Sequence, residues 1–399
     1  MQNSAEPARP YIGGQAVLEG VMMRSPKSFA IVVRRKDGSL VVRERSATDE
    51  RTGIWKLPLM RGMYSLVESL RMGNEALRFS SDQLVADLEE EEAQEADAKK
   101  APKKRSTPPS ALNVLSSLGC SLFVLATKPD DEQEEEEKEE TSAPKKVSPA
   151  AELPAERRRS MAPMLVIMVA FMIALPQLVA SGVARLLHLD LALQSPGFQA
   201  LTGVAKLSIV LGYLLLVRRI PDIRRVFQYH GAEHKTITTY EAEEPLDVEH
   251  ARAKTTLHPR CGTTFLVMVV LVSILMFTVL GAVLPRIDTG NSKLDFVAFL
   301  LIKLPFLPVL AGFTFELQRL FARYCTTGPL RALLWPGFLV QKITTIEPDD
   351  DQLEVALASL RTTLLREKGG APDSATEVRL PDYAAVMARE TLEERAEAA

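Results

Sequence analysis

Long apolar stretches alternate with highly charged segments along this 399-residue chain. Four of these stretches, 161–183, 200–217, 263–284 and 296–315, are almost free of charge. Each is close to the roughly 17–25 residues that cross a bilayer core of about 30 Å. The pattern predicts a mainly α-helical, polytopic membrane helix bundle with about four transmembrane helices. The polar N-terminus lacks an early apolar core, so we expect no signal peptide.

A small soluble element is predicted before the first apolar segment. Two β-branched runs flank the stretch 36–39, which contains Asp37-Gly38, a strong hairpin signal. Leucines and a methionine then recur at helical spacing from Leu59 to Leu77, with charges of both signs between them. The mixed signs favour a helix packed on the hairpin over one lying in the membrane interface. We therefore expect a disordered tail over 1–10 and an N-terminal β-hairpin element with an amphipathic helix over 11–81.

The next segment, 82–158, is compositionally distinct from the rest of the chain. It carries 19 acidic and 11 basic residues, so the remainder of the chain has a net charge of about +5. Acid runs, lysine clusters and prolines are typical of a solvated linker, and we predict an acidic disordered linker here. Within it, 111–127 is apolar but only about 17 residues long. It could be a re-entrant or interfacial piece, and if it crossed the bilayer the hairpin would lie on the opposite side.

The distribution of basic residues predicts the orientation in the membrane. Arginines that precede the first span or follow the second and fourth are Arg157, Arg158, Arg159, Arg218, Arg219, Arg224, Arg225, Arg319, Arg323 and Arg331. The other side carries only Arg185, Arg286 and Lys293. We therefore place the loop 218–262 and both termini in the cytoplasm, with the bundle 159–345 in the membrane. The arginines are expected to contact anionic lipids, and no nucleic-acid partner is expected.

Beyond the bundle, Pro348 and three following aspartates form a good helix start. Leu353, Leu357, Leu360 and Leu364 give that helix one apolar face. We predict a cytoplasmic C-terminal helix over 346–368. The remainder, 369–399, is predicted to be a polar tail with room for a short terminal helix.

The candidate chemistry centres on His230, Glu233 and His234. Pro221 and Asp222 can start a helix, and on it positions i, i+3 and i+4 share one face with Cβ atoms roughly 5–6 Å apart. The order His-x-x-Glu-His is that of inverted zinc peptidases, in which the histidines bind metal and the glutamate activates a water molecule. These histidines also fall on the helix's apolar stripe, so each needs a buried partner.

Other residues could complete a metal site at the same membrane boundary. His258 and Cys261 precede the third span and Glu316 follows the fourth, with Glu241 and Cys325 as further candidates. Three protein ligands with an open position are typical of catalytic zinc, and four of structural zinc. A divalent metal, with zinc favoured, is the cofactor that we expect. The alternative is a structural histidine cluster.

Cysteines and intramembrane lysines add two smaller expectations. The three cysteines form no disulfide pattern, so we expect free thiols. Lys206 and Lys303 lie within the second and fourth apolar segments. Buried membrane cations are functional candidates, although both side chains could extend to the outer surface instead.

Four stretches, 13–24, 222–236, 258–263 and 339–350, resemble the YqhQ-like family of bacterial multi-pass membrane proteins, a family of unknown function. The resemblance covers roughly 11–81 and 160–366, and it leaves His250 outside the motifs. It implies a membrane protein of a kind described as a predicted metal-dependent enzyme. Besides the histidines, Glu233 and Cys261, the motif residues singled out are Gly13, Gly14, Gln15, Glu19, Arg24, Asp222, Arg224, Arg225 and Lys235.

The leading hypothesis is a membrane-embedded metalloprotein with a zinc-type hydrolase site, in which His230 and His234 are ligands, Glu233 is the general base, and His258 or Cys261 completes the shell. A rival hypothesis is a non-enzymatic membrane scaffold or assembly factor with a structural histidine network. A small-solute transporter is a third. Four spans without inverted-repeat signals support the transporter only weakly.

Overall fold

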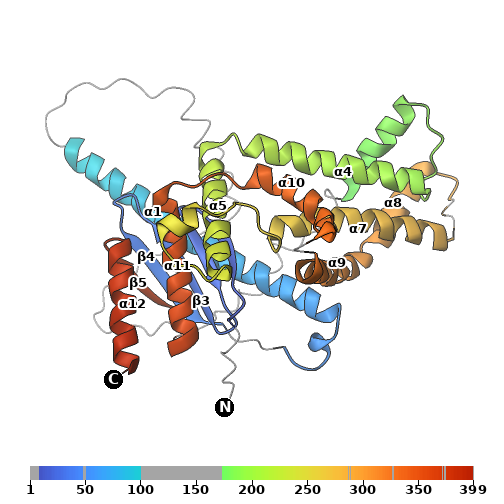
Figure 1. Cartoon of the computed structure of the whole chain (residues 1–399). Coiled ribbons are helices and arrows are strands. Elements are labelled where there is room, and N and C mark those ends of the chain that lie inside the picture. The colour runs from blue at the N-terminus through green and yellow to red at the C-terminus, as the bar shows by residue number, and fades with distance from the viewer. Residues whose placement is uncertain are drawn as a thin grey trace, which may run out of the picture. The chain divides into compact units, whose positions relative to one another are not determined.

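The computed structural model describes residues 9–47, 51–99 and 173–398, apart from 286, 288, 326, 327, 371 and 373. The apolar segment 111–127 and the first part of the predicted span 161–183 lie outside the described residues. The chain divides into two compact units, 1–87 with 161–399, and 88–160. All elements discussed below belong to the first unit, except the end of the first helix (Figure 1).

The N-terminal element is an antiparallel sheet rather than a single hairpin. Its strands β1 (Gly13–Val17), β2 (Gly20–Arg24), β3 (Ser28–Arg34), β4 (Leu40–Ser46) and β5 (Thr376–Leu380) are neighbours in that order. The predicted hairpin is the β3–β4 pair, and Gly38 in its loop has a φ of +88°, which glycine adopts at little cost. The sequence also encodes β1 and β2, whose two-residue connection places Glu19 at a φ of +51°.

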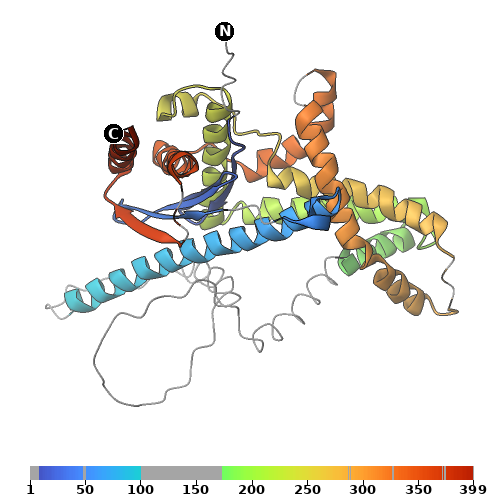
Figure 2. The same cartoon turned by 90° about the horizontal axis from the view of Figure 1, so that it is seen from below.

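Both faces of this sheet are covered by helices, which explains why β3 is buried along almost its whole length. Alternate side chains point to opposite faces. One face, with Val21 and Val32, packs against α5 (Pro221–Glu241) and α11 (Asp350–Gly369). The other face packs against α1 (Met60–Lys99) through Phe79 and its neighbours (Figure 2).

The C-terminal segment completes the sheet. The predicted leucine face of α11 is confirmed, because Leu353, Leu357 and Leu360 are fully buried. The expected polar tail contains a strand that was not predicted, β5, which pairs with β4. It ends in α12 (Tyr383–Ala398), at the place where the prediction left room for a short helix. A five-residue strand carries too weak a pattern to stand out in the sequence.

The helix α1 continues through Lys99, so the predicted disordered linker does not begin at Asp82. No proline or glycine interrupts the sequence between Gly73 and Pro102. Glutamate, glutamine and alanine in this stretch all favour helix. The linker start that we predicted from charge density is therefore wrong. An acidic composition disfavours a packed core but does not prevent an exposed helix.

Two helices, α4 (Pro196–Val217) and α7 (Gly262–Val283), are long and apolar enough to cross a membrane. The predicted span 296–315 is instead two helices, α8 (Ser292–Lys303) and α9 (Phe306–Tyr324), bent by 48° at a break next to Pro305. If the bent pair is counted as one, the described residues contain three candidate spans. Of the predicted span 161–183, the described part is the short apolar helix Ile173–Leu186.

Short elements connect these parts. They are the 3₁₀ helices η1 (Gly53–Lys56) and η2 (Pro329–Leu334) and the α-helices α6 (Val248–Arg252) and α10 (Trp335–Thr344). The start of α1 meets α9 closely, since a Cβ on Gly312 would lie 2.8 Å from the Leu59 carbonyl oxygen. The segment between α10 and α11 crosses α5 and helps to form the site described next.

Candidate metal centre

The helix α5 begins at Pro221 as predicted, with Asp222 in its first turn. From Gly231 to Ile237 every residue is buried, so this part of the helix is covered on all sides rather than along one apolar stripe. The sheet and α11 cover one side. The segments before α7 and after α10 lie against another side, where they reach the histidines. His234 is therefore away from bulk water, and His230, just before this stretch, is half-buried.

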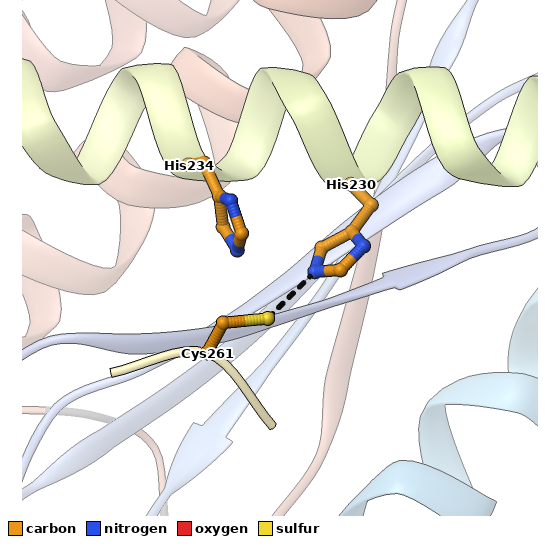
Figure 3. A group of neighbouring side chains, drawn as sticks. All are labelled: His230, His234 and Cys261. Carbon is orange, nitrogen blue, oxygen red and sulfur yellow. Dashed lines mark hydrogen bonds between the residues drawn. The ribbon is translucent and has the colours of Figure 1, made fainter. Parts of the chain in front are cut away.

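His230, His234 and Cys261 converge on one point (Figure 3). One ligand atom from each lies within 4.8 Å of the other two. The His230 Nε2 atom is 3.1 Å from the Cys261 Sγ atom, and the two imidazole rings are 4.4 Å apart between centroids. Cys261 caps α7, and its sulfur accepts a hydrogen bond from the Thr263 amide. The cluster therefore joins the end of one loop to the middle of α5.

Main-chain carbonyl groups orient both imidazoles. The His230 Nδ1 atom lies 2.9 Å from the Thr344 carbonyl oxygen, and the His234 Nδ1 atom lies 2.5 Å from that of Thr256. A carbonyl can only accept, so each Nδ1 donates its proton, and Nε2 is the nitrogen that presents a lone pair to a metal when the ring is neutral. The His234 Nε2 atom is buried without a hydrogen-bond partner. A second hydrogen bond that fixes the tautomer is characteristic of metal-binding histidines.

The cluster is also strongly coupled electrostatically. Burial alone would raise the pKa of the Cys261 thiol, but His230 and His234 lower that pKa well below its usual range. Burial alone would lower the pKa of His230, but the Cys261 thiolate raises it to about 9. The cysteine is therefore poised as a thiolate, the form that binds metal.

His258 lies beside the cluster but is oriented elsewhere. Its ring centroid is 5.7 Å from that of His234, and its Nε2 atom is 3.3 Å from the Glu241 carboxylate. Burial lowers the pKa of His258 to about 4, so the ring is neutral near pH 7. Gln341 holds the main chain of His258 at both its amide and its carbonyl group. These contacts make it a buried neighbour of the three converging residues.

Glu316 and Cys325 do not join the cluster. The Glu316 carboxylate forms a two-pronged ion pair with Arg61 at the start of α1. Cys325 packs in a separate apolar group with Leu334 and Phe338. The sequence analysis placed Glu316 just after the fourth span, but α9 continues to Tyr324, so Glu316 lies within that helix. The sequence also could not show that Arg61 would bind its carboxylate.

Glu233 faces the sheet rather than the sulfur atom. A Cβ on Gly14 would lie 2.7 Å from the Glu233 side chain, so glycine is needed for β1 to approach it. The carboxylate also accepts a hydrogen bond from the Ala16 amide. Burial raises the pKa of Glu233, against the opposing effect of His230 and His234. A raised pKa is the property of a carboxyl group that exchanges protons near neutral pH.

The remaining motif residues connect the strands to the helices. Glu19 binds Arg225, with 2.6 Å between the carboxylate and guanidinium, and accepts a hydrogen bond from Tyr229. Other contacts are Arg24 with Glu68, Gln15 against Gly73, and Lys235 with Glu347 and the Arg252 carbonyl oxygen. Asp222 and Arg224 lie on the exposed first turn of α5, and Gly13 is in β1.

The sequence analysis missed the backbone that supports the site. Thr256, Thr344 and Gln341 act through carbonyl groups or an amide side chain, which no ligand motif includes. The only available signal was that Thr344 and Gln341 lie in the matching stretch 339–350. Gly231 gave a clearer signal, since a glycine inside a helix suggests close approach of another backbone.

Replacing Gly231 with alanine should destabilise the protein. A Cβ there would lie 2.1 Å from the Ile346 carbonyl oxygen. The Ile346 amide donates a hydrogen bond to the Phe227 carbonyl oxygen, which holds this segment against α5. Overpacking of this kind typically costs about 1–3 kcal/mol, against about 1 kcal/mol gained in helix propensity. The measurement is the apparent melting temperature of detergent-purified protein.

Gly212 provides a matched control for this substitution. It lies in α4, and no atom lies within 4 Å of the position that a Cβ would take. Gly212→Ala should leave the melting temperature unchanged or raise it slightly. Equal melting temperatures for the two variants would contradict the steric explanation.

Comparison with known proteins places the chain among relatives whose activity is not described. A family described as "Protein of unknown function (DUF1385)" matches residues 57–366. The chain is 29% identical over 369 residues to the "Uncharacterized protein YqhQ" of Bacillus subtilis (strain 168), covering 91% of this chain and 96% of the relative. No solved structure matches. Because the family match spans most of the chain, the protein is a member of the DUF1385 family of unknown function.

Proposed function

We propose that the protein is a membrane metalloprotein in which His230, His234 and Cys261 bind one divalent ion, with zinc favoured. The observation that carries the proposal is the convergence of three ligand atoms within 4.8 Å, two of them on imidazoles whose Nδ1 atoms are anchored to carbonyl groups. Two nitrogens and one thiolate are a donor set that suits zinc. The unpartnered Nε2 atom of His234 is a buried lone pair that a metal would satisfy.

A hydrolase is the enzyme class that this ligand set fits best. Three protein ligands would leave one position on a zinc ion open. Zinc held in this way would lower the pKa of a water molecule at that position. Glu233 would take the proton of that water on its carboxylate, as the His-x-x-Glu-His order suggests. Burial raises the pKa of Glu233, the direction that makes a carboxylate a stronger base. The hydrogen bond from the Ala16 amide would hold its side chain in place.

We further propose that the site lies at the cytoplasmic boundary of the inner membrane. Cys261 is the residue directly before α7, and three residues separate the end of α4 from the start of α5. α4 and α7 are both long and apolar enough to span a membrane. The arginines that follow α4 support a cytoplasmic location and contact with anionic lipids. About four spans, including the segment 161–183, and cytoplasmic termini are part of the same proposal.

Elemental analysis of detergent-purified protein tests the metal site. The wild type should contain about one zinc per chain, and the His230→Ala/His234→Ala double variant should contain almost none, because one thiolate alone cannot hold the ion. His250→Ala is the matched control, since the His250 side chain is 40% exposed and bonds to Asp247. This variant should leave the metal content unchanged.

Equal and substoichiometric metal in all three proteins would reject the proposal. It would favour the rival class, a scaffold or assembly factor in which the histidines form a structural network with Thr256 and Thr344. Crosslinking and pull-down of the wild type would then be expected to recover a stoichiometric protein partner.

A further inference from the structure

A second polar site lies among the apolar helices, apart from the histidine cluster. A small cavity is lined by residues of the helix Ile173–Leu186, α4, α7 and α8, among them Gln177, Lys206, Ser273 and Lys303. Its free space is about that of one water molecule. Among the described residues, no aspartate or glutamate lines it. Two basic side chains therefore share a cavity to which the described part of the chain contributes no carboxylate.

Lys303 is held firmly in this cavity. Its side chain is 2% exposed, and its Nζ atom donates to the Oε1 atoms of Gln177 and Gln199 at 3.2 and 3.1 Å. The rings of Phe299 and Phe277 lie 4.4 and 5.0 Å from the Nζ atom. The side chain therefore points into the bundle and does not extend to a membrane surface. An ammonium group has three donors, so these glutamines leave one unused.

Two further donors of the cavity lack acceptors. The Gln177 Nε2 atom is completely buried and has no hydrogen-bond partner. Lys206 has no ion pair or hydrogen bond among the described residues, although it lies near the middle of α4. Ser273 already donates its hydroxyl to a main-chain carbonyl group. The cavity is thus rich in donors and poor in acceptors, and desolvating cations without a counter-charge is costly.

The position in the bundle adds an independent observation. Lys303 is the last residue of α8, directly before the break at which α8 and α9 bend by 48°. Broken helices within a membrane are tolerated where they line a cavity, and in transporters they are often found at ion sites.

From these observations we propose that the cavity is a binding site for one small monovalent anion of about the size of chloride. The ion would accept hydrogen bonds from the ammonium groups of Lys206 and Lys303 and from the Gln177 amide. Its charge would offset that of the two lysines, and its size would match the free space. This site is separate from the proposed metal centre and does not require it.

The NMR linewidth of chloride tests the site, because exchange with a protein site broadens the line. The full chain in detergent, at constant ionic strength, should broaden the chloride line beyond micelles alone, and bromide should remove the excess. Gluconate, which is too large for the cavity, should not compete. Lys206→Met and Lys303→Met should each reduce the excess to the level of micelles alone.

Two further variants keep the result independent of folding. Lys206→Arg retains the charge at a partly buried position and should retain the broadening, whereas Lys293→Met removes an exposed lysine at the start of α8 and should change nothing. Helix content and gel filtration identify folded samples. The proposal is overturned if folded Lys206→Met broadens the line as the wild type does. It is also overturned if the wild type shows no excess that bromide displaces.

Discussion

A Cys261→Ser variant should bind zinc about 100- to 1,000-fold more weakly than the wild type. Structural zinc sites contribute about 10–16 kcal/mol from four ligands, so one ligand is worth about 3–4 kcal/mol, and 1.4 kcal/mol is tenfold. His230 and His234 lower the pKa of Cys261 well below its usual range, which favours the thiolate. A serine hydroxyl stays protonated there and cannot replace it. Competition with a chelating dye measures the affinity.

Cys325→Ser is the matched control, because Cys325 is equally a buried free thiol but packs among apolar side chains. It should retain wild-type zinc affinity. Cobalt substitution gives a second reading, since a thiolate ligand produces a charge-transfer band. That band should be present in the wild type and in Cys325→Ser, and absent in Cys261→Ser. A band of undiminished strength in Cys261→Ser would exclude the cysteine as a ligand.

Glu44→Ala should reduce the free energy of unfolding by about 3–5 kcal/mol, the usual cost of removing one partner from a buried ion pair. The Glu44 side chain is 3% exposed and accepts hydrogen bonds from Arg366 of α11 and Arg389 of α12. Its removal leaves the two guanidinium groups with Glu393 alone, whose side chain is more exposed than that of Glu44. For an element of this size the apparent melting temperature should fall by roughly 6–20 °C.

Glu377→Ala is the control for this prediction. Glu377 pairs with Arg43 on the exposed side of β5, and its side chain is 45% exposed. Such surface pairs are worth about 0–1 kcal/mol, so the melting temperature should hardly change. A similar fall in melting temperature for both variants would show that the burial of Glu44 does not determine its contribution to stability.

The same carboxylate predicts an acid-sensitive stability. Burial alone would raise the pKa of Glu44, but Arg366 and Arg389 lower it below its usual value of 4.5. A lowered pKa means that the contribution is fully present above about pH 4.5 and is lost as the pH falls through the folded-state pKa. Thermal melts of wild type and Glu44→Gln should therefore converge at low pH. A constant difference down to low pH would argue against this linkage.

Local patterns predicted most of the elements but not their pairing. The leucine face of α11 and the β3–β4 hairpin follow from short-range periodicity, and the structure has both. By contrast, β5 pairs with β4 across more than 300 residues, and nothing within five residues specifies that partner. The break between α8 and α9 was missed because hydropathy sums over a window and hides a proline at residue 305.

For the candidate site, spacing on one helix was enough to bring His230 and His234 together. Cys261 and His258 were predicted as neighbours because they lie at the same expected membrane depth as the histidine pair. The same criterion also predicted Glu316, whose carboxylate binds Arg61 instead. Side-chain direction cannot be deduced from depth. The sequence analysis singled out Gly14 only through the resemblance of the stretch 13–24. The structure shows its role, because the absence of a side chain at Gly14 leaves room for Glu233.

The sheet has a consequence for the order of synthesis. Met23 of β2 and Thr363 of α11 are hydrogen-bonded although 340 residues separate them. At about 5–20 residues per second, the ribosome reaches α11, the helix that covers β2 and β3, roughly 20–70 s after it has made β2. During that interval α5 is made and can cover β1 and β2, but the same face of β3 and β4 still lacks its covering helix α11. The nascent chain therefore needs protection from aggregation at its N-terminal strands until the last quarter of the protein has been translated.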